Sequence, residues 1–150
     1  MRKNVVLVMI LTIFVAGIFM FWLWRQKNLN SDLCAYTESL LDVQWKEYIE
    51  DVTGEILTDE EEYALLKLKV KEGCEQEIID ILYTRCGKSI DVSSFVMPGY
   101  KEHIYAMELK ELDILYIFTI AMDGKKVKTR GVTVYIANDD RNQTYIYIFG

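Results

Sequence analysis

Few residues in this chain are of a type that does chemistry on its own: one histidine, His103, and three cysteines, Cys34, Cys74 and Cys86. A single histidine excludes metal sites built on several imidazoles, and a cysteine–histidine nucleophile would have to use His103. Nothing in the spacing brings a cysteine to that histidine. We therefore interpret His103 as structural, and we predict no catalytic residue, no metal site and no enzymatic activity.

The cysteine count limits the disulfide chemistry. Three cysteines leave at least one unpaired within a monomer. One disulfide is compatible with a domain outside the cytosol, and the sequence does not choose the pair. Cys74 and Cys86 could not be bridged inside one continuous helix, because the helix between them would span about 18 Å. Buried free thiols are the default interpretation, although the position of Cys34 would also suit a bridge between two chains.

Acidic residues cluster at positions 59–62 and 139–140. Neither cluster has the alternating oxygen ligands and central glycine of a calcium loop. We interpret the first as the acidic start of a helix, where the helix dipole favours carboxylates, and the second as a hairpin loop. A pair such as Glu108 and Asp113 could act in acid–base catalysis, but spacing alone does not argue for it.

Two short motif matches have simpler explanations. Residues 87–89, Gly-Lys-Ser, resemble the end of a phosphate loop, but the earlier glycine of that motif is missing and a predicted helix precedes it. We interpret them as a helix stop. Residues 142–144, Asn-Gln-Thr, match the glycosylation acceptor pattern, which matters only for a lumenal loop of a eukaryotic protein. We predict no cofactor.

Charge is divided unevenly along the chain. Four of the 17 basic residues precede Asp32 and all 23 acidic residues lie at or after it, so the part from Asp32 onward carries 13 basic residues and a net charge of −10. Such an acidic domain repels phosphate backbones, which argues against nucleic-acid binding. It argues equally against broad adhesion to an anionic lipid surface.

Residues 4–24 contain no charged side chain. About 20 apolar residues in a helix cross a hydrocarbon core of about 30 Å. The stretch ends in Trp22 and Trp24 and is followed by Arg25 and Lys27, as expected at a membrane interface. We predict a transmembrane helix over residues 4–24 that contacts the lipid bilayer. A cleaved signal peptide would need small residues before its cleavage point, and a lipoprotein would need one next to Cys34.

Basic residues flank this helix almost evenly, with Arg2 and Lys3 on one side and Arg25 and Lys27 on the other. A short N-terminal segment stays most easily in the cytoplasm. We therefore expect a single-pass cell-membrane protein, with a cytoplasmic N-terminus and an extracytoplasmic C-terminal domain. The expected organisation is an anchor over residues 1–27, a short linker over 28–31 and one α+β domain over 32–150.

The first half of this domain has helical patterns. Apolar residues at helical spacing predict a helix from residue 33 to residue 49, ended by Gly54. A capping box at residues 58–61 favours a second helix that reaches residue 74, although residues 66–71 alternate like a strand. Residues 75–85 continue helically and Gly87 supplies a stop. Residues 90–100 are expected to form a loop or irregular edge.

The second half favours strands, at residues 102–109, 113–122, 125–137 and 143–149, with a polar loop at 138–142. Asp123 and Gly124 suit a two-residue type I′ turn. That turn would pair Ile120 with Val127 and Phe118 with Thr129. One face of the hairpin would then be apolar, and the other would direct three cations to solvent: Lys126, Lys128 and Arg130.

The expected fold is α+β, with two or three helices packed on one face of a four-stranded antiparallel meander sheet. This order of elements over residues 32–150 resembles the cystatin-like or NTF2-like architecture, although no sequence motif carries the resemblance. Membrane-anchored members of that superfold include components of secretion channels and conjugation machines. The resemblance implies a small-molecule pocket, an enzyme or an oligomerising module, and it does not choose among them.

The first functional hypothesis is a protein-interaction or oligomerisation module. Its support is the retained anchor and a terminal aromatic strand, with Tyr145, Tyr147 and Phe149, that could present a free sheet edge. A filled interior with an exposed edge would favour this hypothesis.

The alternative hypothesis is an NTF2-like pocket that binds or transforms a small apolar ligand. Tyr116, Phe118 and Tyr135 would line that pocket. A polar residue deep among these aromatic side chains, such as His103 or Glu108, would favour it.

Overall fold

The computed structural model describes residues 2–57, 63–94, 103–121 and 131–150. They form two compact units, Met1–Asp32 and Leu33–Gly150, which are described separately. Helix α1, Arg2–Leu41, begins in the first unit and ends in the second. Residues 28–31, expected as a short linker, are helical and lie within α1. They include neither proline nor glycine, so nothing local interrupts the helix.

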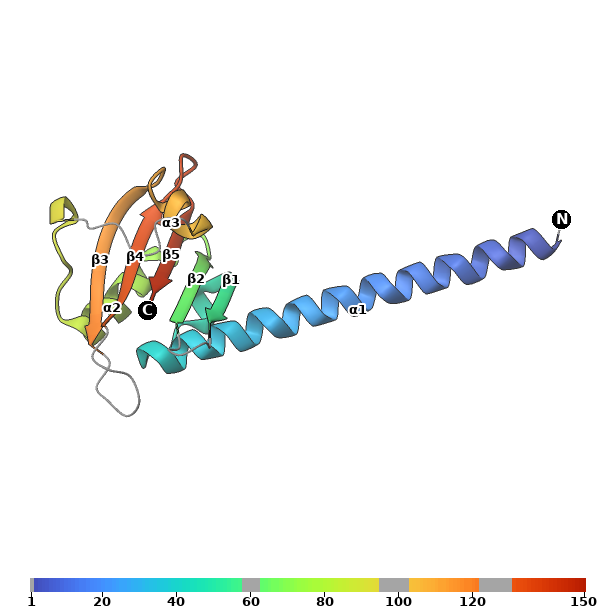
Figure 1. The fold of residues 1–150 in the computed structure, drawn as a ribbon, viewed down its shortest axis with the longest axis horizontal. Helices are drawn as coiled ribbons and strands as arrows, with labels where there is room; N and C mark the ends of the chain where they lie inside the picture. The colour runs from blue at the N-terminus through green and yellow to red at the C-terminus, as the bar shows by residue number, and fades with distance from the viewer. Residues whose placement is uncertain (1, 58–62, 95–102, 122–130) are drawn as a thin grey trace. The chain divides into compact units, whose positions relative to one another are not determined.

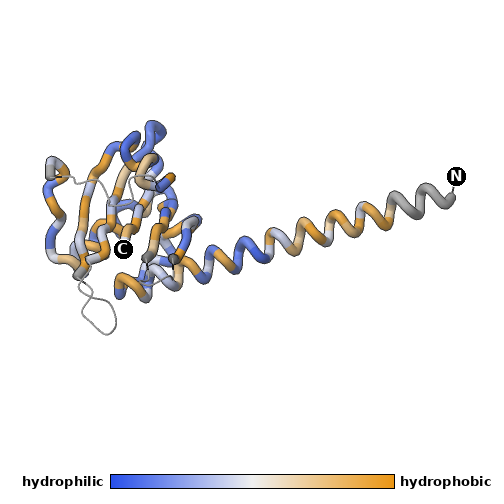
Figure 2. Tube along the Cα trace, in the orientation of Figure 1, coloured by the Kyte–Doolittle hydropathy of each residue, from blue (hydrophilic) through white to orange (hydrophobic). Residues whose placement is uncertain are grey.

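In the first unit, α1 exposes apolar side chains all round. Every side chain from residue 9 to residue 29 is exposed, including Phe14 at 68%, Phe21 at 62% and Trp24 at 60%. Figure 2 shows this stretch as mostly hydrophobic, with hydrophilic residues following it. In the part of the chain that is described, α1 is the one helix long and apolar enough to cross a membrane, by length and composition.

The second unit is built on a five-stranded antiparallel sheet in the order β1-β2-β5-β4-β3 (Figure 1). Its strands are β1 (Ile49–Leu57), β2 (Tyr63–Val70), β3 (Asp113–Ala121), β4 (Gly131–Asn138) and β5 (Thr144–Phe149). The predicted α+β class is confirmed. The predicted four-stranded meander is wrong, because β1 and β2 form a second hairpin and β2 pairs with β5.

The helices of this unit are α2 (Glu75–Cys86) and α3 (Ile104–Leu109), with 3-10 turns at Lys46–Tyr48 and Val92–Ser94. The prediction of α2 is confirmed, and Gly87 ends it at a φ of 77°. A positive φ suits glycine because it has no Cβ.

The helix predicted to reach residue 49 is wrong, because α1 ends at Leu41 and β1 begins at Ile49. Between them, Oε1 of Glu38 accepts hydrogen bonds from the backbone N–H groups of Trp45 and Lys46, both at 2.8 Å. The Trp45 side chain is fully buried. The Glu38 carboxylate therefore supplies the acceptor that these two N–H groups would have found in a continued helix. The same turn buries a large aromatic side chain.

The helix predicted over the residues of β2 is also wrong. The alternation of apolar and basic residues at 66–71, which favoured a strand, agrees with the structure. Leu66, Leu68 and Val70 are fully buried on one face, while Lys67 and Lys69 lie on the other and are half-buried. A strand places alternate residues on opposite faces, which separates the leucines from the lysines. A helix would have mixed them around its circumference. The capping box at 58–61 lies outside the described residues.

Residues 102–109 were expected to form a strand, but 104–109 form α3. Ala106 and Leu109 are both fully buried at a spacing of three residues, which places them on one helical face. The side chain of His103 caps this helix by accepting a hydrogen bond from the backbone N–H of Tyr105 at 3.2 Å. A histidine acceptor at this position is not among the usual N-cap signals.

The predicted register of the β3–β4 hairpin is wrong by five residues. Ile120 pairs with Val132 and Phe118 with Val134, instead of Val127 and Thr129. Burying the β-branched residues of β4 against the core fixes the register more strongly than the local turn signal does. The predicted turn and its three cations, at residues 122–130, lie outside the described residues.

Each face of the sheet carries its own core, so the expectation of helices on one face is wrong. One core joins α2 and the end of α1 to the first face; it includes Cys34, Leu41, Trp45, Val52, Leu66, Ile78, Leu82, Phe118, Val134 and Ile148. The other joins α3 to the opposite face; it comprises Leu65, Ala106, Leu109, Ile117, Tyr135, Ala137, Tyr147 and Phe149. Figure 1 shows α2 and α3 on opposite sides of the sheet.

Candidate functional site

A polar cleft of about 290 Å³ lies on the face of the sheet that α3 covers. Helix α3 packs against β2 on that face and forms one wall of the cleft. The cleft is lined by Asp51 and Thr53 of β1, Lys67 and Lys69 of β2, Tyr145 of β5, and Tyr105 and Glu108 of α3. Strand register aligns these residues in two rows, in which Thr53 pairs with Lys67 and Asp51 pairs with Lys69.

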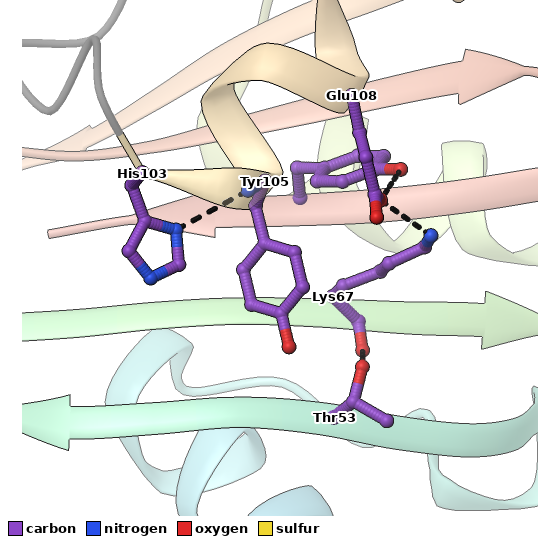
Figure 3. Close-up of polar contacts among 6 residues, drawn as sticks. Thr53, Lys67, His103, Tyr105 and Glu108 are labelled. Atoms are coloured by element: carbon purple, nitrogen blue, oxygen red, sulfur yellow. Dashed lines mark hydrogen bonds and ion pairs between the residues drawn. The ribbon is translucent and has the colours of Figure 1, made fainter.

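Glu108 forms the centre of the cleft. Its Oε2 lies 2.6 Å from Nζ of Lys67 and accepts a hydrogen bond from the hydroxyl of Tyr147 at 3.1 Å (Figure 3). Nζ of Lys67 also lies 4.7 Å from the ring centre of Tyr145 and 5.5 Å from that of Tyr147. The ammonium group therefore lies against one carboxylate and two aromatic rings.

Burial raises the pKa of Tyr147 far above its ordinary value, and the neighbouring Glu108 carboxylate raises it further. Both causes disfavour a tyrosinate. The hydroxyl therefore stays protonated at neutral pH and serves as a hydrogen-bond donor. It is not available as a base.

His103 lies at the end of the cleft nearest the start of α3, where Figure 3 shows its ring turned toward the backbone of Tyr105. Nδ1 accepts from Tyr105 N–H, so a neutral ring carries its proton on Nε2. Nε2 then donates to Oε1 of Glu55 at 2.8 Å. Nδ1 therefore caps α3, and Nε2 joins the start of α3 to β1.

The cleft ends at β1, which is an edge strand of the sheet. Within the described residues, β1 pairs with β2 alone. The other edge, β3, is partly covered, because Ile90 forms a bridge with Ile117 and its N–H donates to the Ile117 carbonyl at 2.7 Å. As far as the described ranges go, the two edges therefore differ, and β1 has the more accessible one.

The pocket of the alternative hypothesis would need Tyr116, Phe118 and Tyr135 together, and the structure places them on two faces of the sheet. Tyr116 and Phe118 belong to the core beneath α2, where the Tyr83 ring meets the Phe118 ring edge-on at a centroid distance of 5.2 Å. Tyr135 belongs to the opposite core and packs edge-on against Phe149 at 5.6 Å. The alternation of side chains along β3 and β4 separates these residues onto two faces.

The aromatic C-terminal strand was expected at an edge, which is also wrong. β5 lies between β2 and β4. Tyr147 and Phe149 are buried, and Tyr145 is half-buried beside Lys67. One neighbour, β4, directly precedes β5 in the sequence, but the other, β2, is distant, so the central position of β5 could not be inferred from local pattern.

The remaining sequence motifs have structural roles. Oδ1 of Asp139 accepts from the backbone N–H groups of Arg141 and Gln143, both at 2.9 Å, and so shapes the β4–β5 loop. Ser89, after the helix stop, shares a hydrogen bond of 3.1 Å with Tyr83. In the described part of the chain, no three His, Cys, Asp or Glu side chains gather as a metal site would require.

All three cysteines are free thiols. Cys34 is only 4% exposed, so it does not present its sulfur for the bridge between two chains that its position suggested. Cys74 precedes α2 and Cys86 is its last residue. The length of α2 therefore separates the two thiols, which is too far for a disulfide.

Sequence reasoning missed most of the cleft, because it placed β2 in a helix and predicted no strand at β1. The alternation of leucine and lysine along residues 66–71 was the signal that could have found Lys67 and Lys69. No pattern in the sequence indicates that Lys67 and Lys69 lie near α3. Comparison of the chain with protein-family models, curated proteins and solved structures gives no match.

Proposed function

We propose that this protein is anchored in a cell membrane by residues 4–24, with its N-terminus in the cytoplasm and the unit Leu33–Gly150 outside it. The exposed apolar side chains of α1 support lipid contact, because water would be a poor solvent for so continuous an apolar surface. Trp22 and Trp24, followed by Arg25 and Lys27, suit the interface at the outer end.

The proposed function of the folded unit is to bind another protein. One observation carries this proposal: β1 is a nine-residue strand that, in the described part of the chain, has a neighbouring strand on one side. An edge strand presents backbone N–H and C=O groups that a further strand can pair with. Extended segments commonly bind to sheets in this way, with side-chain contacts supplying specificity.

A non-enzymatic role agrees with the way the charged groups of the cleft are used. Lys67 is paired with Glu108, and His103 is held by Tyr105 and Glu55. These contacts fix the residues that would otherwise be the first candidates for proton transfer. The alternative of a pocket for a small apolar ligand has less support, because four of the seven lining residues are charged.

We further propose that the unit is related to the cystatin-like or NTF2-like architecture. The packing of α2 and the end of α1 against one face of an antiparallel sheet supports this proposal. The relation concerns architecture and does not carry a function.

Topology is tested by thiol labelling in intact cells. The three native cysteines are replaced by alanine, and Asp140, an exposed residue of the β4–β5 loop, is changed to cysteine. Labelling of Asp140→Cys by a membrane-impermeant reagent without lysis is the expected result. Labelling only after lysis would place the unit in the cytosol and overturn the proposed orientation, while the proposal on the β1 edge would stand.

Protein binding is tested by placing a photo-crosslinking amino acid at Thr53, which is exposed on β1, in the full chain in its membrane. The matched control carries the same group at Glu77, which is exposed on α2. Adducts from position 53 to one defined protein, with none from position 77, are expected. Equal adducts from both positions, or none from either, would contradict an interaction site on β1.

A further inference from the structure

We infer that the segment bound at β1 is an extended, lysine- or arginine-rich stretch of another protein, added to the sheet as a sixth strand. This inference rests on the proposed function, because it requires that β1 binds a protein. It names the chemistry of the bound segment, and three features of β1 and its surroundings carry it.

The first feature is the charge of the strand. β1 carries three carboxylates, from Glu50, Asp51 and Glu55, and no lysine or arginine. Natural edge strands are often protected by lysine or proline, and β1 has neither. Its carboxylates would instead attract a cationic strand and oppose an anionic one.

The second feature is the balance of charge around the cleft. Counting the described residues and including Glu108, the cleft and its β1 rim hold four carboxylates against two ammonium groups, those of Lys67 and Lys69. Glu50 binds Lys69 at 2.8 Å and Glu55 binds His103 at the same distance. Each carboxylate has two oxygens and accepts several hydrogen bonds, so these contacts do not exhaust its capacity for a further cation. The local excess of negative charge remains.

The third feature is the alternation of side chains. Asp51 and Thr53 lie on the cleft face of β1, whereas Val52 is buried in the core on the other face. A paired strand would place its own side chains in the same two rows, about 5 Å from those of β1. The structure therefore favours a segment that alternates basic residues, facing the cleft, with apolar residues beside Val52.

A second copy of this chain is disfavoured as the occupant. If two β1 strands paired in antiparallel orientation about Thr53, Asp51 of each copy would lie opposite Glu55 of the other. Like charges placed directly opposite one another destabilise a strand pair. The charge that attracts a basic segment thus also discourages the edge from pairing with itself.

The test uses the full chain in nanodiscs of uncharged lipid, so that cationic peptides do not adsorb to the membrane. Three seven-residue peptides are compared, in which valine alternates with lysine, threonine or glutamate. Binding is measured by titration, and the site is identified by hydrogen-exchange protection of β1. We expect the lysine peptide to bind about tenfold more tightly than the threonine peptide. Its affinity should fall as salt is raised, because the charges are exposed.

Two variants test whether the carboxylates of β1 determine the affinity for the lysine peptide while the sheet stays folded. Replacing Glu50 and Glu55 together by glutamine should bring the affinity of the lysine peptide down to that of the threonine peptide. Asp140→Asn, which removes an exposed carboxylate of the β4–β5 loop, should leave it unchanged. Hydrogen-exchange protection of β5 in each variant checks that the sheet is intact, since β5 lies at its centre.

Each outcome decides one point. Equal binding of lysine and threonine peptides along β1 would overturn the cationic segment and leave the protein-binding edge standing. Protection of β1 by none of the peptides, together with no adduct from position 53, would overturn both. Binding of the lysine peptide without protection of β1 would overturn the inference. Protection of β1 that grows with protein concentration and needs no peptide would identify a second copy as the occupant.

Discussion

Nζ of Lys67 on β2 lies 2.6 Å from Oε2 of Glu108 on α3, and the two residues are 41 positions apart in sequence. This ion pair is one of the polar contacts between α3 and the sheet. It stands beside the aromatic rings of Tyr145 and Tyr147, and Tyr147 donates a second hydrogen bond to the same oxygen. The cleft is therefore organised around one shared acceptor atom.

Glu108→Ala should destabilise the folded unit by about 1–3 kcal/mol, because Lys67 and Tyr147 would lose their partner while half-buried or buried. A double-mutant cycle between Lys67 and Glu108, measured by urea unfolding, should give a coupling energy of about 1 kcal/mol. The comparison pair is Lys69 and Glu50, which is more exposed and should couple by about 0.3 kcal/mol. Equal coupling in the two pairs would contradict a special role for Glu108.

Gly54 should be intolerant of substitution. Its φ is +145°, and a Cβ added there would lie 2.3 Å from the backbone oxygen of Leu65 on the paired strand. Gly54→Ala should therefore cost about 2–4 kcal/mol in the free energy of unfolding, from strain and a contact with backbone that cannot move aside.

The matched control for this prediction is Gly73→Ala. Gly73 also has a positive φ, of +81°, but no atom lies within 4 Å of the added Cβ. Only the backbone penalty remains, and the expected cost is about 1 kcal/mol. Thermal unfolding of both variants would check this difference, and a larger loss at position 73 would show that the β1–β2 approach is looser than described.

The Trp45 indole depends on one hydroxyl. Its Nε1–H donates to Oγ1 of Thr37 at 3.1 Å, and Thr37 donates in turn to the Cys34 carbonyl at 2.7 Å. Thr37→Val keeps the shape but leaves the buried Nε1–H without this acceptor, so a loss of about 1–3 kcal/mol is expected. Thr37→Ser keeps the hydroxyl and should preserve the indole N–H resonance of Trp45 in NMR spectra, which Thr37→Val should shift. An unshifted resonance in Thr37→Val would contradict the hydrogen bond.

Two buried tyrosines predict the behaviour of the unit at alkaline pH. Burial raises the pKa of Tyr135 and of Tyr147 above the ordinary 10.0. In the unfolded chain both hydroxyls release their protons first, so the folded state binds more protons above about pH 10. Stability is therefore insensitive to these groups at lower pH and falls as the pH rises past 10.

The measurement is the free energy of unfolding at a series of pH values from about 8 to 11.5. Each buried tyrosine can contribute a slope of up to about 1.4 kcal/mol per pH unit. Tyr147→Phe removes one of the two groups, and its stability should fall less steeply than that of the unchanged protein. The slopes are compared, because the variant also lacks the hydrogen bond to Glu108 and starts from a different stability. Parallel slopes would contradict the raised pKa of Tyr147.

Several features of this protein follow from the sequence by itself, because their causes are local. The uncharged run at residues 4–24 makes α1 apolar all round, whatever follows it. The amphipathic pattern of α2 and its stop at Gly87 depend on residues within a few turns of one another. The apolar character of β3 and the polar loop before β5 are likewise local properties.

Tertiary structure alone decided the rest, because the deciding contacts join distant parts of the chain. Leu66 and Leu68 form a strand, not the predicted helix, because β1 and β5 pair with β2 on either side. β5 lies at the centre of the sheet and β1 at its edge for the same reason. The cleft exists only where α3 stops short of β1 and Glu108 reaches Lys67. Local patterns determine which residues seek burial, while the pairing of distant strands determines which side chains meet and which edge stays open.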